Sequence, residues 1–248
     1  MRIMKKLNIS FAFLFLTVFF LIQGLSVGSA YGVEKGAEDA ILRAQETIKV
    51  LEEGIAHAEE VLQQIKKRGT RNEYQRALEI KQEAERMLAE ASKHIADAKN
   101  IAGEFNSAPT DTVADAVSYS SRAKAETAWI YAKIGLIFLE ALQFAADGEF
   151  DCTEEMNVAL QDRQDTWSTM KKIVELADKS LVHTRSALTV QATAADEAAK
   201  GIEAAKQCIA LARDLNLRLE NIEDICNDFI KKWRDYKDQE DDEDPSPV

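Results

Sequence analysis

Proline and glycine are scarce in this chain of 248 residues. It contains 3 prolines and 10 glycines, and Pro245 and Pro247 lie close to the C-terminal end, so Pro109 is the one interior proline. β-Sandwiches and β-barrels need frequent turns rich in these residues, so this scarcity argues against an all-β fold. Hydrophobic residues make up 46% of the chain, which argues against disorder. Because alanine, glutamate, lysine and leucine are abundant and favour helices, we expect an all-α fold.

Histidine is also rare, and the short motifs of common catalytic and cofactor sites are missing. None of the three histidines, His57, His94 and His183, follows a glutamate by three positions, which is the spacing of di-metal sites in helical bundles. Glycine-rich phosphate loops, zinc-protease motifs, nucleophile elbows and haem attachment motifs are absent. We therefore predict no catalytic residue, no cofactor and no metal site, and we interpret each histidine as a surface residue.

Three cysteines allow at most one disulfide bond. Cys208 and Cys226 are 18 positions apart on one expected helix, and a separation of roughly 27 Å along that helix is too long for a disulfide. Antiparallel packing of the last two helices brings Cys152 near Cys226. We therefore name Cys152 and Cys226 as the disulfide candidate, and the alternative is that all three are buried free thiols.

Basic residues are outnumbered by acidic ones, which gives a net charge of -12. Residues 1–30 hold three basic residues and no acid, so the remainder of the chain has a net charge of -15. Such a chain repels phosphate groups, which excludes nucleic acid and anionic lipid as general partners. Residues 235–248 hold seven acids against Lys237, and we expect this segment to be a disordered acidic tail.

The N-terminus has the three parts of a secretory signal peptide. Three positive charges lie within Met1–Lys6, an apolar run of 14 residues covers Ile9–Ile22, and small residues follow at Gly28–Ala30. The apolar run is short for a membrane-spanning helix. We expect residues 1–30 to be removed after Ala30, which makes the chain an exported protein of the periplasm or the medium. The alternative is an uncleaved N-terminal anchor.

Turn signals divide the rest of the chain at nearly constant intervals. They lie at 67–70, 106–111 and 147–151, and a weaker one lies at 190–194. The spacing predicts five helices, at about 35–67, 71–105, 111–147, 152–190 and 194–238. Helices of such uniform length are typical of a long antiparallel bundle. We assign the bundle domain to residues 31–234, between the signal peptide and the tail.

Heptad spacing of small and apolar residues predicts coiled-coil-like seams along these helices. The seams run through the following positions: Ile41, Ala44, Ile48, Leu51, Ile55, Ala58, Leu62 and Ile65 in the first helix; Tyr74, Ala77, Ala84, Leu88, Ala91, Ile95, Ala98 and Phe105 in the second; Leu160, Trp167, Val174, Leu181 and Leu188 in the fourth; Cys208, Ala212, Leu215, Leu219, Ile222, Cys226, Phe229, Trp233 and Tyr236 in the fifth.

The third expected helix is apolar on every side between residues 128 and 146. Lys133 and Glu140 are its only charges there, and they share one face. A helix that is hydrophobic all round is either buried among other helices or inserted in a membrane. We expect a central buried helix with one exposed edge, and a membrane-inserting or hydrophobe-binding helix is the alternative.

These patterns favour a structural or protein-binding role over catalysis. We predict an exported, non-enzymatic helical bundle that binds a protein partner or a second copy of itself. The expected interface lies either at the edge near Trp129 and Phe138 or at the end near Trp233 and Tyr236. Two alternatives stay open: a bundle that binds a metal ion or a small hydrophobe, and a membrane-active bundle that inserts residues 128–146.

Overall fold

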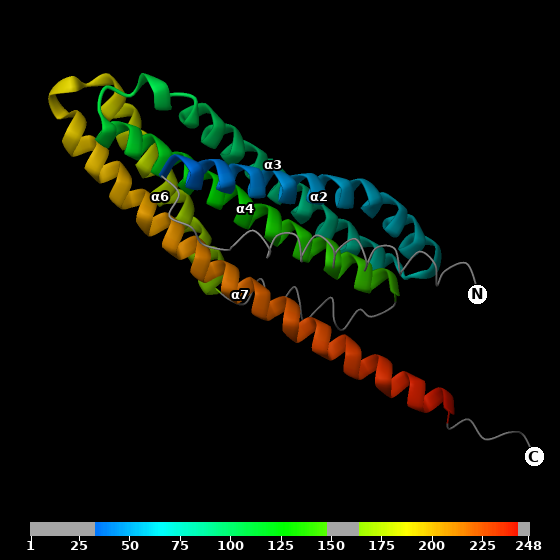
Figure 1. Ribbon diagram of the computed structural model, residues 1–248. Helices are drawn as coiled ribbons and strands as arrows, with labels where there is room; N and C mark the ends of the chain where they lie inside the picture. Colours follow the sequence, from blue (N-terminus) through cyan, green and yellow to red (C-terminus); the bar gives the residue numbers. More distant parts are fainter. Residues whose placement is uncertain (1–32, 148–163, 243–248) are drawn as a thin grey trace, which may run out of the picture. The chain divides into compact units, whose positions relative to one another are not determined.

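The computed structural model describes residues 33–147 and 164–242, and all regular structure in these ranges is helical (Figure 1). This confirms the all-α prediction. The signal peptide and Cys152 lie outside the described residues. The helices, with two short 3-10 turns, are α2 (Val33–Arg68), α3 (Arg71–Ala102), η1 (Phe105–Ser107), α4 (Asp111–Asp147), α6 (Gln164–Thr189), η2 (Gln191–Thr193) and α7 (Ala194–Asp242).

The turn between α2 and α3 lies at Gly69, within the turn predicted at residues 67–70. The Gly69 amide donates to the Ile65 carbonyl at 2.7 Å, which closes α2. Thr70 then caps α3: its hydroxyl accepts from the Glu73 amide at 3.3 Å, and the Glu73 carboxylate accepts from the Thr70 amide at 2.5 Å. This reciprocal capping box satisfies amide groups that otherwise lack partners at a helix start.

Pro109 lies in the turn between α3 and α4, as expected. The preceding residue, Ala108, has an extended backbone with φ -63° and ψ 129°, which is the conformation that a following proline favours. The chain also breaks between α6 and α7, where Val190 and η2 separate the two helices. The last two helices are therefore separate, while α7 continues to Asp242, eight residues into the segment expected to be a tail.

Helix α4 is central and packs against α2, α3, α6 and α7. In Figure 1 it lies between the α2–α3 pair and the α6–α7 pair. Its side chains Ile130, Ile134 and Ile137 are at most 1% exposed. This explains why its sequence is apolar on every side, and it confirms the central buried helix. By length and composition α4 is also the one described helix that could cross a membrane.

The predicted seams are confirmed in α2 and in α7 as far as Ile222, but the seam of α6 is displaced. Of the predicted positions, Leu181 is buried, while Trp167, Val174 and Leu188 are half-buried beside a more deeply buried stripe. Leu160 lies outside the described residues. The stripe consists of Thr166, Met170, Ile173, Ala177, Ser180, Thr184 and Ala187. Small side chains occupy its centre because α7 approaches closely there: a Cβ on Gly201 would lie 2.9 Å from the Thr184 hydroxyl. Counting large apolar residues therefore identified Leu181 correctly but missed most of this stripe.

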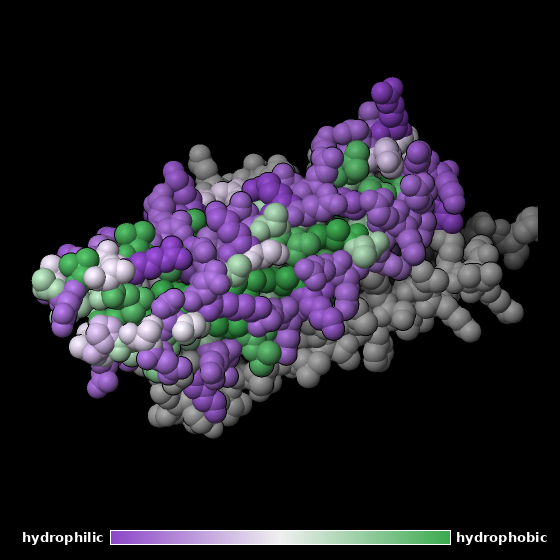
Figure 2. Space-filling model, turned by 90° about the horizontal axis from the view of Figure 1, so that it is seen from above, coloured by the Kyte–Doolittle hydropathy of each residue, from purple (hydrophilic) through white to green (hydrophobic). Residues whose placement is uncertain are grey.

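Hydrophilic side chains cover much of the surface. Figure 2 shows one face, on which hydrophobic groups lie between hydrophilic ones. Among the described residues the large exposed hydrophobic side chains are Leu42, Val182, Val190 and Leu217, on α2, on α6, in the α6–α7 turn and on α7. They are spread over several elements, and single exposed hydrophobic residues of this kind are normal on soluble proteins.

Candidate functional site: a buried charged cluster on α4

Polar residues interrupt the core in the first half of α4. Lys124 is 1% exposed, although lysine is almost never fully buried unless it is paired. It lies on a seam of alternating four and three residue steps that includes Val117, Ser120, Thr127 and Tyr131. This spacing carries Lys124 into the interior, because the seam as a whole faces neighbouring helices.

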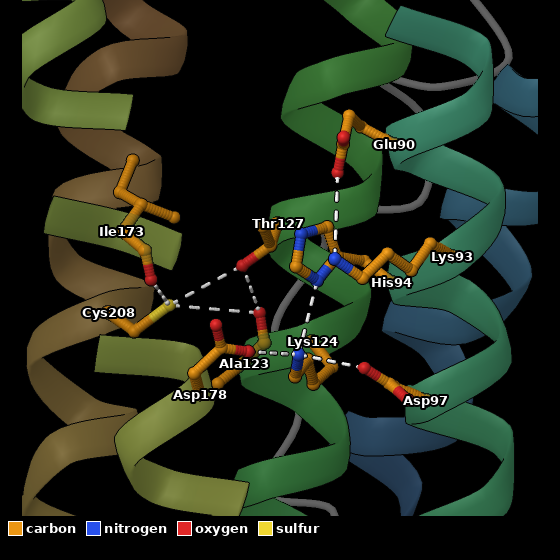
Figure 3. Close-up of polar contacts among 10 residues, drawn as sticks. All are labelled: Glu90, Lys93, His94, Asp97, Ala123, Lys124, Thr127, Ile173, Asp178 and Cys208. Atoms are coloured by element: carbon orange, nitrogen blue, oxygen red, sulfur yellow. Dashed lines mark hydrogen bonds and ion pairs between the residues drawn. The ribbon is translucent and has the colours of Figure 1, made fainter. Parts of the chain in front are cut away.

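Three helices meet at the ammonium group of Lys124 (Figure 3). Its Nζ donates to Asp97 Oδ2 of α3 at 2.9 Å and to Asp178 Oδ1 of α6 at 2.5 Å. Nδ1 of His94, also on α3, lies 3.3 Å from the same Nζ. Because an ammonium group has three N–H donors, these three contacts satisfy it completely. Lys124 therefore ties α3 and α6 to the central helix.

His94 is buried in this cluster, which corrects the prediction that each histidine is a surface residue. Its side chain is 1% exposed and stacks on the ring of Tyr131, with centroids 5.6 Å apart and planes 9° apart. Burial, reinforced by the positive charge of Lys124, lowers the pKa of His94 to about 4. The imidazole is therefore neutral at pH 7. The signal was present in the sequence, because His94 lies at seam spacing between Ala91 and Ala98.

A buried thiol lies beside the cluster (Figure 3). Cys208 of α7 has its Sγ 3.5 Å from the Ile173 carbonyl and 3.7 Å from both the Ala123 carbonyl and the Thr127 hydroxyl. Burial raises the pKa of this thiol to about 12. Because the thiolate is the reactive form of cysteine, Cys208 is a poor nucleophile in this position.

A second group of charges lies elsewhere along α4. Glu126, 2% exposed, pairs with Arg43 of α2 and lies 3.6 Å from Nε of Arg122. Further along, Lys133 donates to the Asn216 side chain of α7 at 2.8 Å and lies 3.6 Å from Glu220. Lys133 is thus 8% exposed instead of marking an exposed edge. These contacts tie α2 and α7 to α4, as Lys124 ties α3 and α6.

The predicted interface residues on α4 are buried. Trp129 is 6% exposed and Phe138 is 2% exposed, so the exposed edge expected there is not found. The guanidinium of Arg43 covers the Trp129 ring at 4.0 Å from its centroid, and the Lys133 ammonium lies 5.3 Å from it. Phe138 belongs to the main hydrophobic core. These two side chains are therefore unavailable to a partner while the helices stay packed.

The other predicted sites lie outside what the structure describes in atomic detail. The side chains of Trp233 and Tyr236, on the C-terminal part of α7, are outside the described residues, and so is the Cys226 side chain. The Cys152–Cys226 pairing therefore stays a prediction. Cys208 is a free thiol.

The remaining two histidines are each paired with a carboxylate. His57 Nδ1 lies 3.5 Å from Glu60, and His183 Nδ1 lies 2.7 Å from Glu197. Hydrogen bonds from Lys200 and His183 lower the pKa of Glu197. Among the side chains that the structure describes, which exclude those of the C-terminal part of α7, no three of the histidine, cysteine, aspartate and glutamate types gather closely enough to hold a metal ion.

Comparisons with protein-family models, with curated proteins and with solved structures found no match. Function is therefore inferred from the chain's own residues. The buried charges Lys124, Glu126 and Lys133 of α4 form contacts with neighbouring helices, and the Cys208 thiol is buried and protonated at pH 7. The contacts of this cluster join α4 to neighbouring helices.

Proposed function

We propose that this chain is an exported helical bundle with a structural role, which it performs by binding a partner helix through the C-terminal part of α7. A second copy of the chain is the partner to be tested first. The proposal assigns no catalysis to the bundle. It keeps the expected export signal in residues 1–30, and the mature chain would begin at Tyr31.

The state of the buried polar groups supports a role without catalysis. Enzymes need an acid, a base or a nucleophile with a pKa near the working pH and access to substrate. Here Lys124 is fully engaged by its three contacts, His94 is buried with its pKa lowered to about 4, and Cys208 is buried with its pKa raised to about 12. None of these three groups combines reactivity at pH 7 with exposure to solvent.

The register of α7 against α4 is the observation that carries the binding proposal. Lys133 contacts Asn216, which is 83 positions later, and at that offset the last residue of α4, Asp147, lies level with position 230. The part of α7 from position 231 to Asp242 therefore extends past α4 (Figure 1). A helix of 49 residues is about 73 Å long and one of 37 residues is about 55 Å long, so α4 cannot cover all of α7.

The sequence of this extension keeps the pattern of a helix-binding seam. Phe229, Trp233 and Tyr236 continue the four and three residue steps that begin at Cys208. Aromatic residues with such spacing suit packing against another helix, since a seam of this kind adds a strand to a coiled coil. The predicted interface at Trp233 and Tyr236 is therefore retained, while that at Trp129 and Phe138 is given up.

Light scattering of the mature chain over a range of concentrations tests the proposal. We expect an oligomer whose mass falls to that of one chain when Trp233 and Tyr236 are both replaced by serine. Lys231 and Asp238 lie off the seam on the same part of α7, and replacing both by serine is the matched control. The control should keep the mass of the wild type. A single-chain mass at every concentration would count against self-association, and equal behaviour of both variants would count against the seam.

A membrane-active bundle is the second candidate, favoured by one observation. The length and apolar composition of α4 suit a membrane span. Its burial in the packed bundle means that the helices must separate before α4 can insert. Dye release from liposomes at neutral and at acidic pH tests this function, and the absence of release at both pH values would exclude it.

A further inference from the structure

The contact between His94 and Lys124 lies at the joint of three helices. His94 and Asp97 belong to α3, Lys124 to α4, and Asp178 to α6. Lys124 and His94 are each 1% exposed, whereas the side chains of Asp97 and Asp178 are 28% and 56% exposed. The centre of the joint is therefore buried and its edge is exposed to solvent, and His94 belongs to the buried centre.

The hydrogen bonds in the joint require a neutral histidine. An ammonium group can only donate, so Nδ1 of His94 accepts from Lys124 and the ring proton is on Nε2. Nε2 is buried and has no hydrogen-bond partner. A second proton on the ring would turn Nδ1 into a donor that faces another donor at 3.3 Å. The contact cannot survive this change.

The charges around His94 are balanced while the ring is neutral. Lys93 and Asp97 face it from its own helix, Lys124 from α4 and Asp178 from α6. Tyr131 of α4 stacks on the ring and is uncharged. Two positive and two negative charges thus surround the imidazole. A proton on His94 leaves one uncompensated positive charge at a site where burial makes such a charge costly.

We propose that His94 and Lys124 form an acid-sensitive latch, which holds α3 and α6 on α4 at neutral pH and releases them when His94 gains a proton. Protonation first breaks the contact between His94 and Lys124, because the imidazolium and the ammonium group are both positively charged and repel each other. It then weakens the ion pairs to Asp97 and Asp178, since both depend on the position of the Lys124 ammonium. The latch gives the bundle a way to expose α4 in acidic surroundings, at about pH 4. It does not depend on the proposed partner of α7.

The sign and size of the effect follow from proton linkage. The pKa of His94 is 6.5 in an unfolded chain and about 4 in the folded one, so the unfolded chain binds the proton more readily. Stability is therefore lost as the pH falls from 6.5 towards 4, and this contribution changes no further below 4. Between about pH 7 and about pH 4.5, the contribution of His94 raises the unfolding equilibrium constant roughly 60-fold.

Urea unfolding of the mature chain at these two pH values tests the latch. Asparagine at position 94 keeps an acceptor for Lys124 and does not titrate, so His94→Asn should remove a factor of roughly 60 from the pH response of the wild type. His57→Asn changes a histidine of α2 outside the joint and is the matched control, which should keep the part of the response that His94 contributes. Equal pH responses of His94→Asn and the wild type would overturn the proposal.

Two measurements on the wild type keep the test decisive if His94→Asn does not fold. In an NMR titration, the His94 ring should change protonation at about pH 4, and a midpoint near 6.5 would overturn the latch. Hydrogen exchange, corrected for its intrinsic pH dependence, should speed up at acidic pH in α3 around Asp97 and in α6 around Asp178. It should change less in α7 around Cys208, and a uniform increase over all helices would refute release at this joint.

Discussion

Gly135 lies where both α2 and α3 approach the central helix closely, and its replacement by alanine tests the packing around α4. A Cβ at position 135 would lie 2.7 Å and 2.9 Å from the two terminal carbons of Leu51 on α2, and 3.2 Å from Cβ of Met87 on α3. Carbon atoms in contact are normally at least about 3.5 Å apart. The Leu51 methyl groups can rotate away, but the Cβ of Met87 is fixed by its backbone.

Two opposing effects decide the outcome of Gly135→Ala. Alanine stabilises the middle of a helix by about 1 kcal/mol relative to glycine. Overpacking of a tight core costs about 1 to 3 kcal/mol. Because the added methyl group meets atoms of two different helices, we expect the cost to exceed the gain. The variant should be less stable than the wild type by about 1 kcal/mol.

Urea unfolding followed by circular dichroism measures this difference. The control is Gly103→Ala at the end of α3, where a Cβ would meet only carbonyl oxygens at 3.4 Å and 3.7 Å. Its φ of -60° suits alanine, so the control should be neutral or slightly stabilising. In a Leu51→Ala background, where the nearest obstacle is absent, Gly135→Ala should cost less or become stabilising. If Gly135→Ala alone were more stable than the wild type by about 1 kcal/mol, the close approach of α2 and α3 to α4 would be refuted.

Four further predictions concern single residues. Thr70→Ala removes the capping box of α3 and should destabilise the bundle by about 0.5 to 2 kcal/mol in the same urea assay. Cys208 should resist a thiol reagent at about pH 8 in the folded chain and react fully once urea unfolds it, because the thiol is buried and its pKa is raised. Lys124→Met removes a positive charge that opposes protonation of His94, so an NMR titration should show the pKa of His94 above its wild-type value. N-terminal sequencing of the exported chain should begin at Tyr31.

The helices were predictable because their signals are local. Gly69 and Pro109 mark turns by backbone geometry alone, and the seam of α7 repeats without interruption from Cys208 to Ile222. The apolar stretch of α4 likewise indicated a central buried helix, although the exposed edge predicted with it is not found. Such signals depend on the residue and its neighbours along the chain, so they can be read without knowledge of the packing.

The cluster on α4 was missed because its residues are buried through contacts that are distant in the sequence. Lys124 is tolerated in the interior because Asp97 and Asp178 meet it, and they lie 27 and 54 positions away. Patterns of apolar residues alone place a lysine or a histidine on the surface. The heptad steps through Ala91, His94 and Ala98 were the available signal, since a seam position is defined by spacing as well as by residue type.

Contacts with residues distant in the sequence also explain the displaced stripe of α6. Its centre contains Ser180 and Thr184, which are polar but donate hydrogen bonds to carbonyl groups of Gly201 and Ala116 at 2.8 Å and 3.3 Å. Their small size allows close helix approach, and their hydroxyl groups are satisfied. Large apolar residues such as Val174 lie beside this contact. The close approach of α6 to its neighbours thus favours small residues in the buried stripe. A prediction from large apolar residues alone selects the positions beside it.

We propose that the part of α7 beyond α4 binds a partner helix. Its most direct test is a photo-cross-linking amino acid at position 236, in place of the tyrosine, in the mature chain within its own host. The proposal predicts one discrete cross-linked product, at twice the mass of the chain if the partner is a second copy. The same amino acid at Asp238, off the seam, should give little product. No product at position 236, or equal products at both positions, would contradict the claim.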